Sequence, residues 1–324
     1  MSVRLQTHPV ERLFIEEAEH DYAGLNWSYS RRESLEQCTR RYFFQYYATA
    51  LQDVDMRNRS QFLKSVKNRF LRTGELVHLV ISTYFKNLKK GKNLSADWAA
   101  KWAKELFAKD RSYSARVRAG GVLWQQQYPP TILDEVINSQ ENSSALLTHA
   151  EEQMVSSIKN FFESPAFSDF RRLGASAQSR IEGRLSLTGF PVPVSGKVDL
   201  AVPMETSVTI VDWKTGAVSD GGAESLQLAT YGLWGSAEFG VKEDSVQIVK
   251  AYLLTGEVVE FKAGSEAFAN ARVRIHQDLE RMVILHEYGR TGVIDAFTPN
   301  PQLGVCRLCP FREICPEGKA LIHA

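Results

Sequence analysis

The stretch VTIVDWKTG, residues 208–216, constrains this sequence more than any other. Its first residues are apolar or β-branched, which predicts a buried strand. Asp212 and Lys214 then follow within the same strand. Because they are two residues apart, both side chains point to the same face of the sheet. A D-x-K triplet alone is more often an ordinary surface ion pair, so its meaning depends on what the fold places beside it.

A second stretch, PVSGKVDLAV (residues 193–202), also predicts a strand, and the short turn PMETS connects it to the first. We expect a hairpin that brings Asp199 and Asp212 together at one edge of a sheet, beside Lys214. Two neighbouring carboxylates repel each other unless a cation neutralises them, and hard divalent ions such as Mg²⁺ bind carboxylate oxygens. Phosphodiester hydrolysis uses such a site, because the metal polarises the phosphate while a lysine favours the hydroxide form of the attacking water.

Two helical stretches contain polar residues that fit the same site. In GELVHLV (residues 74–80), His78 is either a core histidine or a third metal ligand. In QLATY, Gln227 and Tyr231 are four residues apart and share one helix face. They are either half-exposed surface residues or an amide and a phenol aimed at a nucleic-acid backbone.

Basic residues are concentrated near the N-terminus of a chain whose formal net charge is only +1. Residues 57–72 contain no acidic residue and six basic ones: Arg57, Arg59, Lys64, Lys67, Arg69 and Arg72. A second group consists of Arg31, Arg32, Arg40 and Arg41. Each group is either a solvated helix face or part of a positive stripe that binds phosphates. The aromatic run RYFFQYY (residues 41–47) is either core or a surface for base stacking.

Three of the four cysteines lie within CRLCPFREIC, residues 306–315. Cys306 and Cys309 have two residues between them, Cys309 and Cys315 have five, and Cys38 is far away in the sequence. A zinc ribbon normally provides two close pairs of cysteines, whereas a triplet plus one distant cysteine fits a 4Fe–4S cluster with four thiolates. Such a cluster would join the N-terminal and C-terminal parts of the chain. Four unrelated free thiols are the alternative.

Hydrophobic periodicity predicts an α/β protein in which helices come first, followed by a compact core of strands and helices. We expect strands at 178–189, 192–202, 207–213, 245–254 and 257–262. We expect helices at 28–51 with Ser30 as N-cap, at 57–92 as one helix or two, at 95–170 with breaks near Gly120 and Pro129, at 223–238 and at 265–289. A cysteine-rich tail covers 298–318.

Length and composition set further limits. With 324 residues, of which 44% are hydrophobic, the chain can bury a sizeable core. No apolar run approaches the roughly 20 residues that cross a bilayer, and the N-terminus lacks a secretory apolar segment. We therefore expect a cytoplasmic protein without a membrane partner, in which cysteines bind metal or stay free. The phosphate-loop pattern G-x-x-x-x-G-K-[ST] is absent, so we expect no ATP-driven unwinding of DNA.

Taken together, these motifs resemble the RecB-type nucleases of the PD-(D/E)XK superfamily, in the branch with an iron–sulfur cluster. That branch includes the CRISPR-associated adaptation nuclease and the AddB nuclease domain. The resemblance rests on the opening SYSRRESLEQCTRRYFFQYY, Gly74 to His78, GKVD, DWK, QLATY, and one early and three late cysteines. It implies a restriction-endonuclease-like core, with a central mixed sheet flanked by helices, in a single domain over residues 1–324.

The resemblance also implies roles for the site residues. His78, Asp199 and Asp212 would bind Mg²⁺ or Mn²⁺, together with the backbone carbonyl of Trp213. Lys214 would assist the attacking water.

The same resemblance makes Gln227 and Tyr231 the residues that hold the DNA strand. Glu182, in RIEGRL, falls where related proteins often carry an acidic residue, but we do not expect it to bind the metal. The stretch 84–175 is longer than a minimal nuclease of this kind needs. We expect a helical insertion there, which binds a partner or guides DNA.

We expect a metal-dependent deoxyribonuclease that acts on single-stranded DNA or DNA ends, as an exonuclease more than an endonuclease, in repair, recombination or defence. Its expected partners are a helicase or a CRISPR integrase. The alternative is a non-catalytic iron–sulfur scaffold that binds DNA in a helicase–nuclease or CRISPR adaptation complex. The complete set Asp199, Asp212 and Lys214 argues against that scaffold. An iron–sulfur redox protein is a third class, which no flavin or dinucleotide glycine motif supports.

Overall fold

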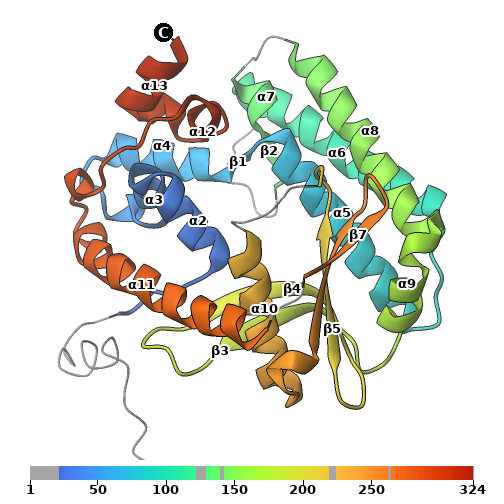
Figure 1. The fold of residues 1–324 in the computed structure, drawn as a ribbon. Helices are drawn as coiled ribbons and strands as arrows, with labels where there is room; N and C mark the ends of the chain where they lie inside the picture. The colour runs from blue at the N-terminus through green and yellow to red at the C-terminus, as the bar shows by residue number, and fades with distance from the viewer. Residues whose placement is uncertain (1–21, 122–128, 139–141, 219–223, 262–263, 324) are drawn as a thin grey trace, which may run out of the picture.

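A five-stranded mixed sheet forms the centre of the protein (Figure 1). The computed structural model describes residues 22–121, 129–138, 142–218, 224–261 and 264–323. In sheet order the strands are β3 (Arg180–Leu187), β4 (Val194–Pro203), β5 (Val208–Lys214), β6 (Val246–Tyr252) and β7 (Glu257–Phe261). β5 and β6 are parallel, and the other neighbouring strands of this sheet are antiparallel. The five expected strands and the mixed α/β architecture are confirmed.

Helices precede, interrupt and follow the sheet in the sequence. Before it come α2 (Tyr29–Gln37), α3 (Thr39–Tyr46), α4 (Val54–Ser65), α5 (Arg69–Leu88), α6 (Ala96–Arg118), α7 (Asp134–Ile137), α8 (Ser143–Glu163) and α9 (Ser168–Gly174). Within or after it come α10 (Glu224–Phe239), α11 (Ser265–Arg290), α12 (Leu303–Arg307) and α13 (Pro316–His323). None of the described helices combines the length and apolar character that a bilayer-spanning segment requires.

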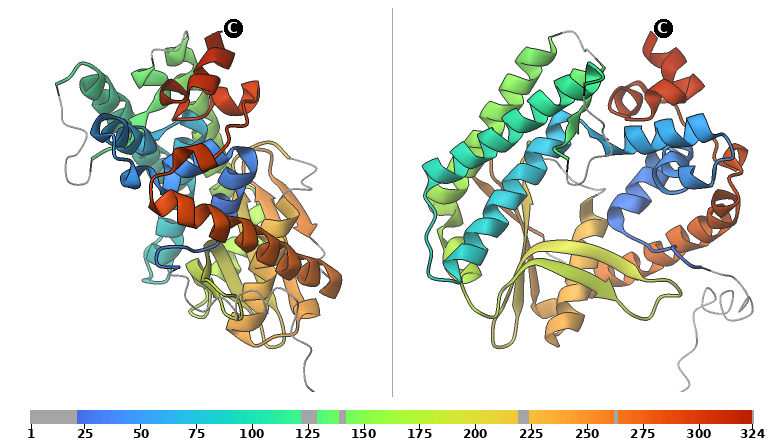
Figure 2. Two further views of the ribbon diagram at one scale, coloured as in Figure 1. Left: turned by 90° about the vertical axis from the view of Figure 1, so that its left-hand side faces the viewer. Right: turned by 180° about the vertical axis from the view of Figure 1, so that it is seen from behind.

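Two helical layers enclose the sheet (Figure 2). On one face, Val208 and Ile210 of β5 pack in the core that α10 and α11 cover. On the other face, Val211 and Trp213 pack in a second core beneath α5, α6 and α8. Because successive residues of a strand point to opposite faces, β5 contributes to both cores. This double burial explains why the strand is apolar along most of its length.

The N-terminal part contains a break that the sequence did not predict. α2 starts after Ser28, whose hydroxyl accepts a hydrogen bond from the backbone N–H of Arg31, so Ser28 and not Ser30 is the N-cap. Cys38 has an extended backbone, with φ −167°, and separates α2 from α3. The expectation of one helix over 28–51 is therefore wrong, because no glycine or proline marks the break.

The structure decides whether the aromatic run 41–47 is core or surface, and whether residues 57–92 form one helix or two. Tyr42, Phe43 and Phe44 are at most 2% exposed, so this part of RYFFQYY is core and not a stacking surface. α4 and α5 are separate helices, which confirms the two-helix alternative for 57–92.

The stretch 84–175 packs directly on the sheet. The buried Phe161 of α8 has its ring centre 5.5 Å from that of Trp213, and Phe170 of α9 is 5.9 Å from it. A short parallel ladder of β1 (Val66–Lys67) and β2 (Ile132–Leu133), which was not expected, ties the stretch to the start of α5. The stretch thus supplies much of one covering layer. Its use for a partner or for DNA stays a prediction.

The breaks expected near Gly120 and Pro129 fall between helices. α6 ends at Arg118, and Gly120 has φ 72°, a left-handed conformation that glycine adopts without strain. Pro129 and Pro130 precede β2 without helical structure. Residues 122–128, between the two breaks, lie outside the described part of the chain.

The C-terminal segment lies against the N-terminal helices, as Figure 1 shows. Thr39 Oγ1 donates a hydrogen bond to the carbonyl oxygen of Thr298, and Phe311 packs on Phe44 with ring centres 5.4 Å apart. These contacts bring the cysteine-rich tail next to Cys38, at the junction of α2 and α3.

Candidate active site

The side chains of β3 and β4 switch from one face of the sheet to the other at Glu182 and Asp199. In a regular strand, residues two positions apart point to the same face. Here Val198 joins the core under α10, whereas Leu200 joins the core under α5 and α8. The backbone of Glu182 has φ 54°, in the left-handed region that residues other than glycine rarely adopt, at the level of this reversal. Glu182 and Asp199 consequently lie at the boundary between the two helical layers.

The expected hairpin of β4 and β5 is present. Its register pairs Leu200 with Val211, and the same register continued places Asp199 opposite Asp212. The β3–β4 pairs on either side of Glu182 place this residue opposite Asp199. Three carboxylates therefore stand in one row across neighbouring strands. The row runs from the edge strand β3 to the central strand β5, and Asp212 and Lys214 lie at the end of β5.

α5 brings His78 to this row of carboxylates. Leu76, Val77 and Val80 of α5 are buried, whereas the His78 side chain keeps 30% of its surface exposed and lines a cleft. Its Nδ1 lies 3.0 Å from Asp199 Oδ1. α5 passes close to the loop after β5 at Gly74, where an added Cβ would lie 3.4 Å from Thr215 Oγ1. His78 is thus part of the polar site rather than a purely apolar core residue.

One group of residues has the geometry of a metal site. His78, Glu182 and Asp199 each place a potential ligand atom within 4.8 Å of the other two, and no other such group occurs among the described residues. An imidazole nitrogen with carboxylate oxygens fits Mn²⁺ well, while Mg²⁺ prefers oxygen ligands alone. The residues present therefore fit a divalent ion. The ligand roles of Asp212 and of the Trp213 carbonyl stay predictions, and the Trp213 backbone N–H donates to Asp199 Oδ2 at 2.9 Å.

The sequence did not predict that Glu182 lies beside His78 and Asp199. A β3–β4 hairpin centred between residues 190 and 191 places it opposite Asp199. Gly189 and Pro191 mark the turn between these strands but do not by themselves fix its register. The register was the signal that could have found it.

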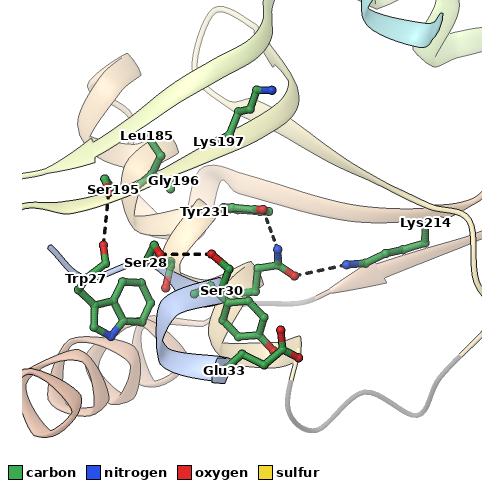
Figure 3. A pocket seen from close by; sticks show the side chains of 13 residues that line it. Trp27, Ser28, Ser30, Glu33, Leu185, Ser195, Gly196, Lys197, Lys214 and Tyr231 are labelled. Carbon is green, nitrogen blue, oxygen red and sulfur yellow. Dashed lines mark hydrogen bonds between the residues drawn. The ribbon is translucent and has the colours of Figure 1, made fainter. Parts of the chain in front are cut away.

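Lys214 belongs to a chain of polar contacts beside Asp212. Its Nζ lies 2.8 Å from Asp212 Oδ2 and donates a hydrogen bond to Gln227 Oε1 at 3.3 Å. Gln227 Nε2 in turn donates to the Tyr231 hydroxyl at 2.8 Å, and Figure 3 shows the two consecutive bonds. The structure therefore brings together the lysine of the strand and the two polar residues of QLATY. Their contacts with DNA stay predictions.

The crowded charges shift two pKa values of the metal-free protein. Burial lowers the pKa of His78, but attraction to Asp199, the hydrogen bond with it, and attraction to Asp212 and Glu182 raise it to about 9. Burial and repulsion from Asp199 raise the pKa of Asp212 to about 6, although Lys214 acts in the opposite direction. Neighbouring negative charge contributes to both shifts, and a divalent ion would neutralise that charge.

The site residues line an open cleft of about 850 Å³ between α5, the end of β5 and α10. A hollow of about 410 Å³ adjoins the cleft, and Lys197, Lys214, Gln227 and Tyr231 line both. Residues at the start of α2, including Ser28 and Ser30, line the opposite side of the hollow, as Figure 3 shows. The cleft is open to solvent, and the hollow extends it toward the start of α2.

The basic residues between 57 and 72 are largely engaged within the protein. Three of them pair with carboxylates of α5, α6 and α7: Lys67 with Glu75, Arg69 with Glu135, and Arg72 with Asp110. Arg57 donates to the carbonyl oxygen of Leu51, whereas Arg59 and Lys64 are exposed. The ion pairs give these three residues a structural role, and contact with DNA stays a prediction for all six.

The cysteine-rich tail folds beside Cys38. The Asn300 backbone N–H lies 3.4 Å from Cys38 Sγ, and all four cysteines are free thiols. Burial raises the pKa of the Cys309 thiol to about 11, and the neighbouring Cys38 and Cys315 add to this increase. No three sulfur atoms lie within 4.8 Å of one another in the described structure, so the thiols do not surround a single ion. The 4Fe–4S cluster stays a prediction.

A row of carboxylates with a lysine at the end of the central strand, beneath a helix that presents a histidine, has the residues that a metal-dependent phosphodiesterase site requires. The chain belongs to the PD-(D/E)XK nuclease superfamily, whose family model matches residues 26–316. A search of curated proteins finds no match. Membership in this superfamily implies a nuclease that uses divalent metal ions and acts on DNA.

Proposed function

We propose that this protein is a RecB-type nuclease with an iron–sulfur cluster, which cuts single-stranded DNA or DNA ends with Mn²⁺ or Mg²⁺. The main support is the convergence of His78, Glu182 and Asp199 on one point of the cleft that also contains Lys214. Both the ligand group and the lysine are accessible from this cleft. An exposed strand end can therefore approach the ligands and the lysine together.

The cleft residues divide the chemical work among them. A divalent ion held by His78, Glu182 and Asp199 would polarise the scissile phosphate and favour ionisation of a water. Lys214, fixed between Asp212 and Gln227, holds the attacking water and stabilises its hydroxide form.

Tyr231 has a separate part in this proposal. Burial, with repulsion from Asp212 and Asp199, raises its pKa well above the usual value, so the phenol keeps its proton. The hydroxyl accepts a hydrogen bond from Gln227, which leaves its own proton available to a phosphate oxygen. Tyr231 thereby orients the strand next to Lys214.

The four cysteines would hold the 4Fe–4S cluster and join the two ends of the domain. Hydrogen bonds already connect these ends, from Arg40 Nε to the Phe297 carbonyl at 2.8 Å and from Asn300 to Cys38. Metal binding by such a set contributes directly to folding. The cluster would therefore fix α2 and α3 beside the cleft and take no part in the hydrolysis.

Duplex DNA would need a partner that supplies a free strand, because the chain has no phosphate loop for an ATP-driven motor. A helicase fits this requirement, and a CRISPR integrase is the other proposed partner. Both would act in the repair, recombination or defence role proposed for this nuclease.

A cleavage assay tests the proposed function. Purified protein is incubated with labelled single-stranded, tailed and blunt duplex DNA of one sequence, with Mn²⁺, Mg²⁺ or EDTA and without ATP. Metal-dependent cleavage that strongly prefers the single strand is expected, and a circular single strand should resist if cutting starts at ends. Protein that binds DNA and never cuts it would instead support the non-catalytic scaffold, and equal rates on all linear substrates would contradict the strand preference.

A further inference from the structure

The Glu182 carboxylate can pair with either of two cations, a divalent ion in the ligand group or the ammonium of Lys197. Glu182 belongs to the ligand group with His78 and Asp199, and its carboxylate also forms an ion pair with Lys197 of β4. Its left-handed backbone at the β3–β4 reversal is a conformation that surrounding structure must hold in place. The side chain is only 16% exposed, so the ion pair with Lys197 offsets part of the cost of burying this carboxylate.

Lys197 is placed differently from Lys214. It lies two residues before Asp199 on β4, and its side chain is 63% exposed. It lines both the catalytic cleft and the adjoining hollow. Figure 3 shows Lys197 on a strand across the hollow from Ser30 and Glu33. An exposed, flexible ammonium at this boundary can turn from the cleft to the hollow without disturbing the core.

We propose that Lys197 is a phosphate-positioning residue that the metal controls. Without metal, Lys197 neutralises Glu182; when a divalent ion takes Glu182 as a ligand, repulsion moves the ammonium into the hollow, where it contacts a phosphate of the nucleic-acid strand. This inference rests on the proposed function. It makes strand binding and metal binding cooperative, because the ion releases a cation that the strand uses.

The test measures binding of a short phosphorothioate single strand by fluorescence anisotropy, in EDTA and in Mn²⁺, over a range of salt concentrations. Lys197→Met is compared with wild type and with Arg184→Met. Arg184 is the exposed cross-strand neighbour of Lys197 and lines neither the cleft nor the hollow, so it controls for general electrostatics.

We expect Lys197→Met to lose affinity severalfold in Mn²⁺ only, with a salt slope shallower by about 0.7, the value of one single-strand phosphate contact. Mn²⁺ binding without DNA, measured by electron paramagnetic resonance, should keep its stoichiometry. An equal loss in EDTA and Mn²⁺, no loss at all, or lost Mn²⁺ binding would overturn the proposal. Cleavage of ordinary single strands by wild type is measured in parallel, and failure there would overturn the proposed function independently.

Discussion

His78 Nδ1 and Asp199 Oδ1 lie 3.0 Å apart, although the two residues are separated by 121 positions in the sequence. This contact joins α5 to β4, so the ligand group exists only when the helical layer is docked on the sheet. Asp199 also accepts a hydrogen bond from the Trp213 backbone, which ties the same carboxylate to β5. One side chain thus connects a helix and two strands, and the chemistry of the site depends on the packing of all three.

Lys214→Gln should slow cleavage by a factor of about 10²–10⁴, because it removes the ammonium proposed to hold the attacking water. It should also lower stability, since the buried Asp212 loses its neighbouring cation. Single-turnover rates on a single strand and Mn²⁺ stoichiometry are measured together. Lys101→Gln, an exposed lysine of α6, is the control. A wild-type rate for Lys214→Gln would remove this lysine from the reaction.

The affinity for Mn²⁺ should rise with pH. His78 is protonated in the metal-free protein up to its pKa of about 9, and a ligating imidazole must be neutral. Affinity should therefore increase about tenfold per pH unit between about 7 and 9 and level off above. Asp212, with a pKa of about 6, is already mostly ionised in this range. Calorimetry in two buffers of different ionisation enthalpy counts the released proton, and His78→Gln should release none.

The same histidine should make the stability of the metal-free protein depend on pH. The pKa of His78 is raised from 6.5 to about 9 on folding, so its contribution is fully present below about pH 6.5 and is lost as pH rises through about 9. Thermal melts in EDTA across this range measure the effect by comparing wild type with His78→Gln. If the melting temperatures of the two proteins change with pH in the same way, another group is responsible.

The sequence predicted what local patterns determine. The strands and the hairpin of Asp199 and Asp212 follow from apolar alternation and a short turn, and the structure has both. The position of Glu182 opposite Asp199 was not predicted, because it depends on the β3–β4 register and on a left-handed backbone. The break at Cys38 was missed because the residue before α3 is neither glycine nor proline.

The ion-pair partners of the basic residues also could not be predicted from local sequence patterns. Arg72 pairs with Asp110 and Arg69 with Glu135, which lie on other helices. A run of positive charge looks unpaired in the sequence when its carboxylates come from distant segments. The fold, rather than the run itself, decides which cations are free for phosphate.

Cys38→Ser should abolish the brown colour of anaerobically purified protein and lower its melting temperature, because one of four thiolates for the proposed cluster is lost. Iron content and visible absorbance are measured beside the melting curve. The effect should extend to cleavage, since Cys38 lies between α2 and α3 at the tail contact. Stoichiometric zinc without iron in the wild-type protein would contradict the cluster and leave a metal-linked junction.

Phe161→Ala should lower the free energy of unfolding by about 3–5 kcal/mol. Its ring is fully buried, 5.7 Å from that of Phe85 and 5.5 Å from that of Trp213, and it thus connects α8 with α5 and β5. Urea unfolding measures the loss. Phe70→Ala is the control, because Phe70 is 50% exposed and its removal should cost less, about 1 kcal/mol.

Deletion of residues 84–175 extends this test to the whole layer. It removes α6, β2, α7, α8 and α9 together with the end of α5, and it exposes the apolar face that Val211 and Trp213 present. Asp212 and Lys214 alternate with these residues on β5, so loss of the layer should also disorder the catalytic strand. We expect an insoluble or unfolded product by expression and circular dichroism. A soluble, folded variant that still cuts single strands would show that the sheet needs no such cover and that the stretch is an independent insertion.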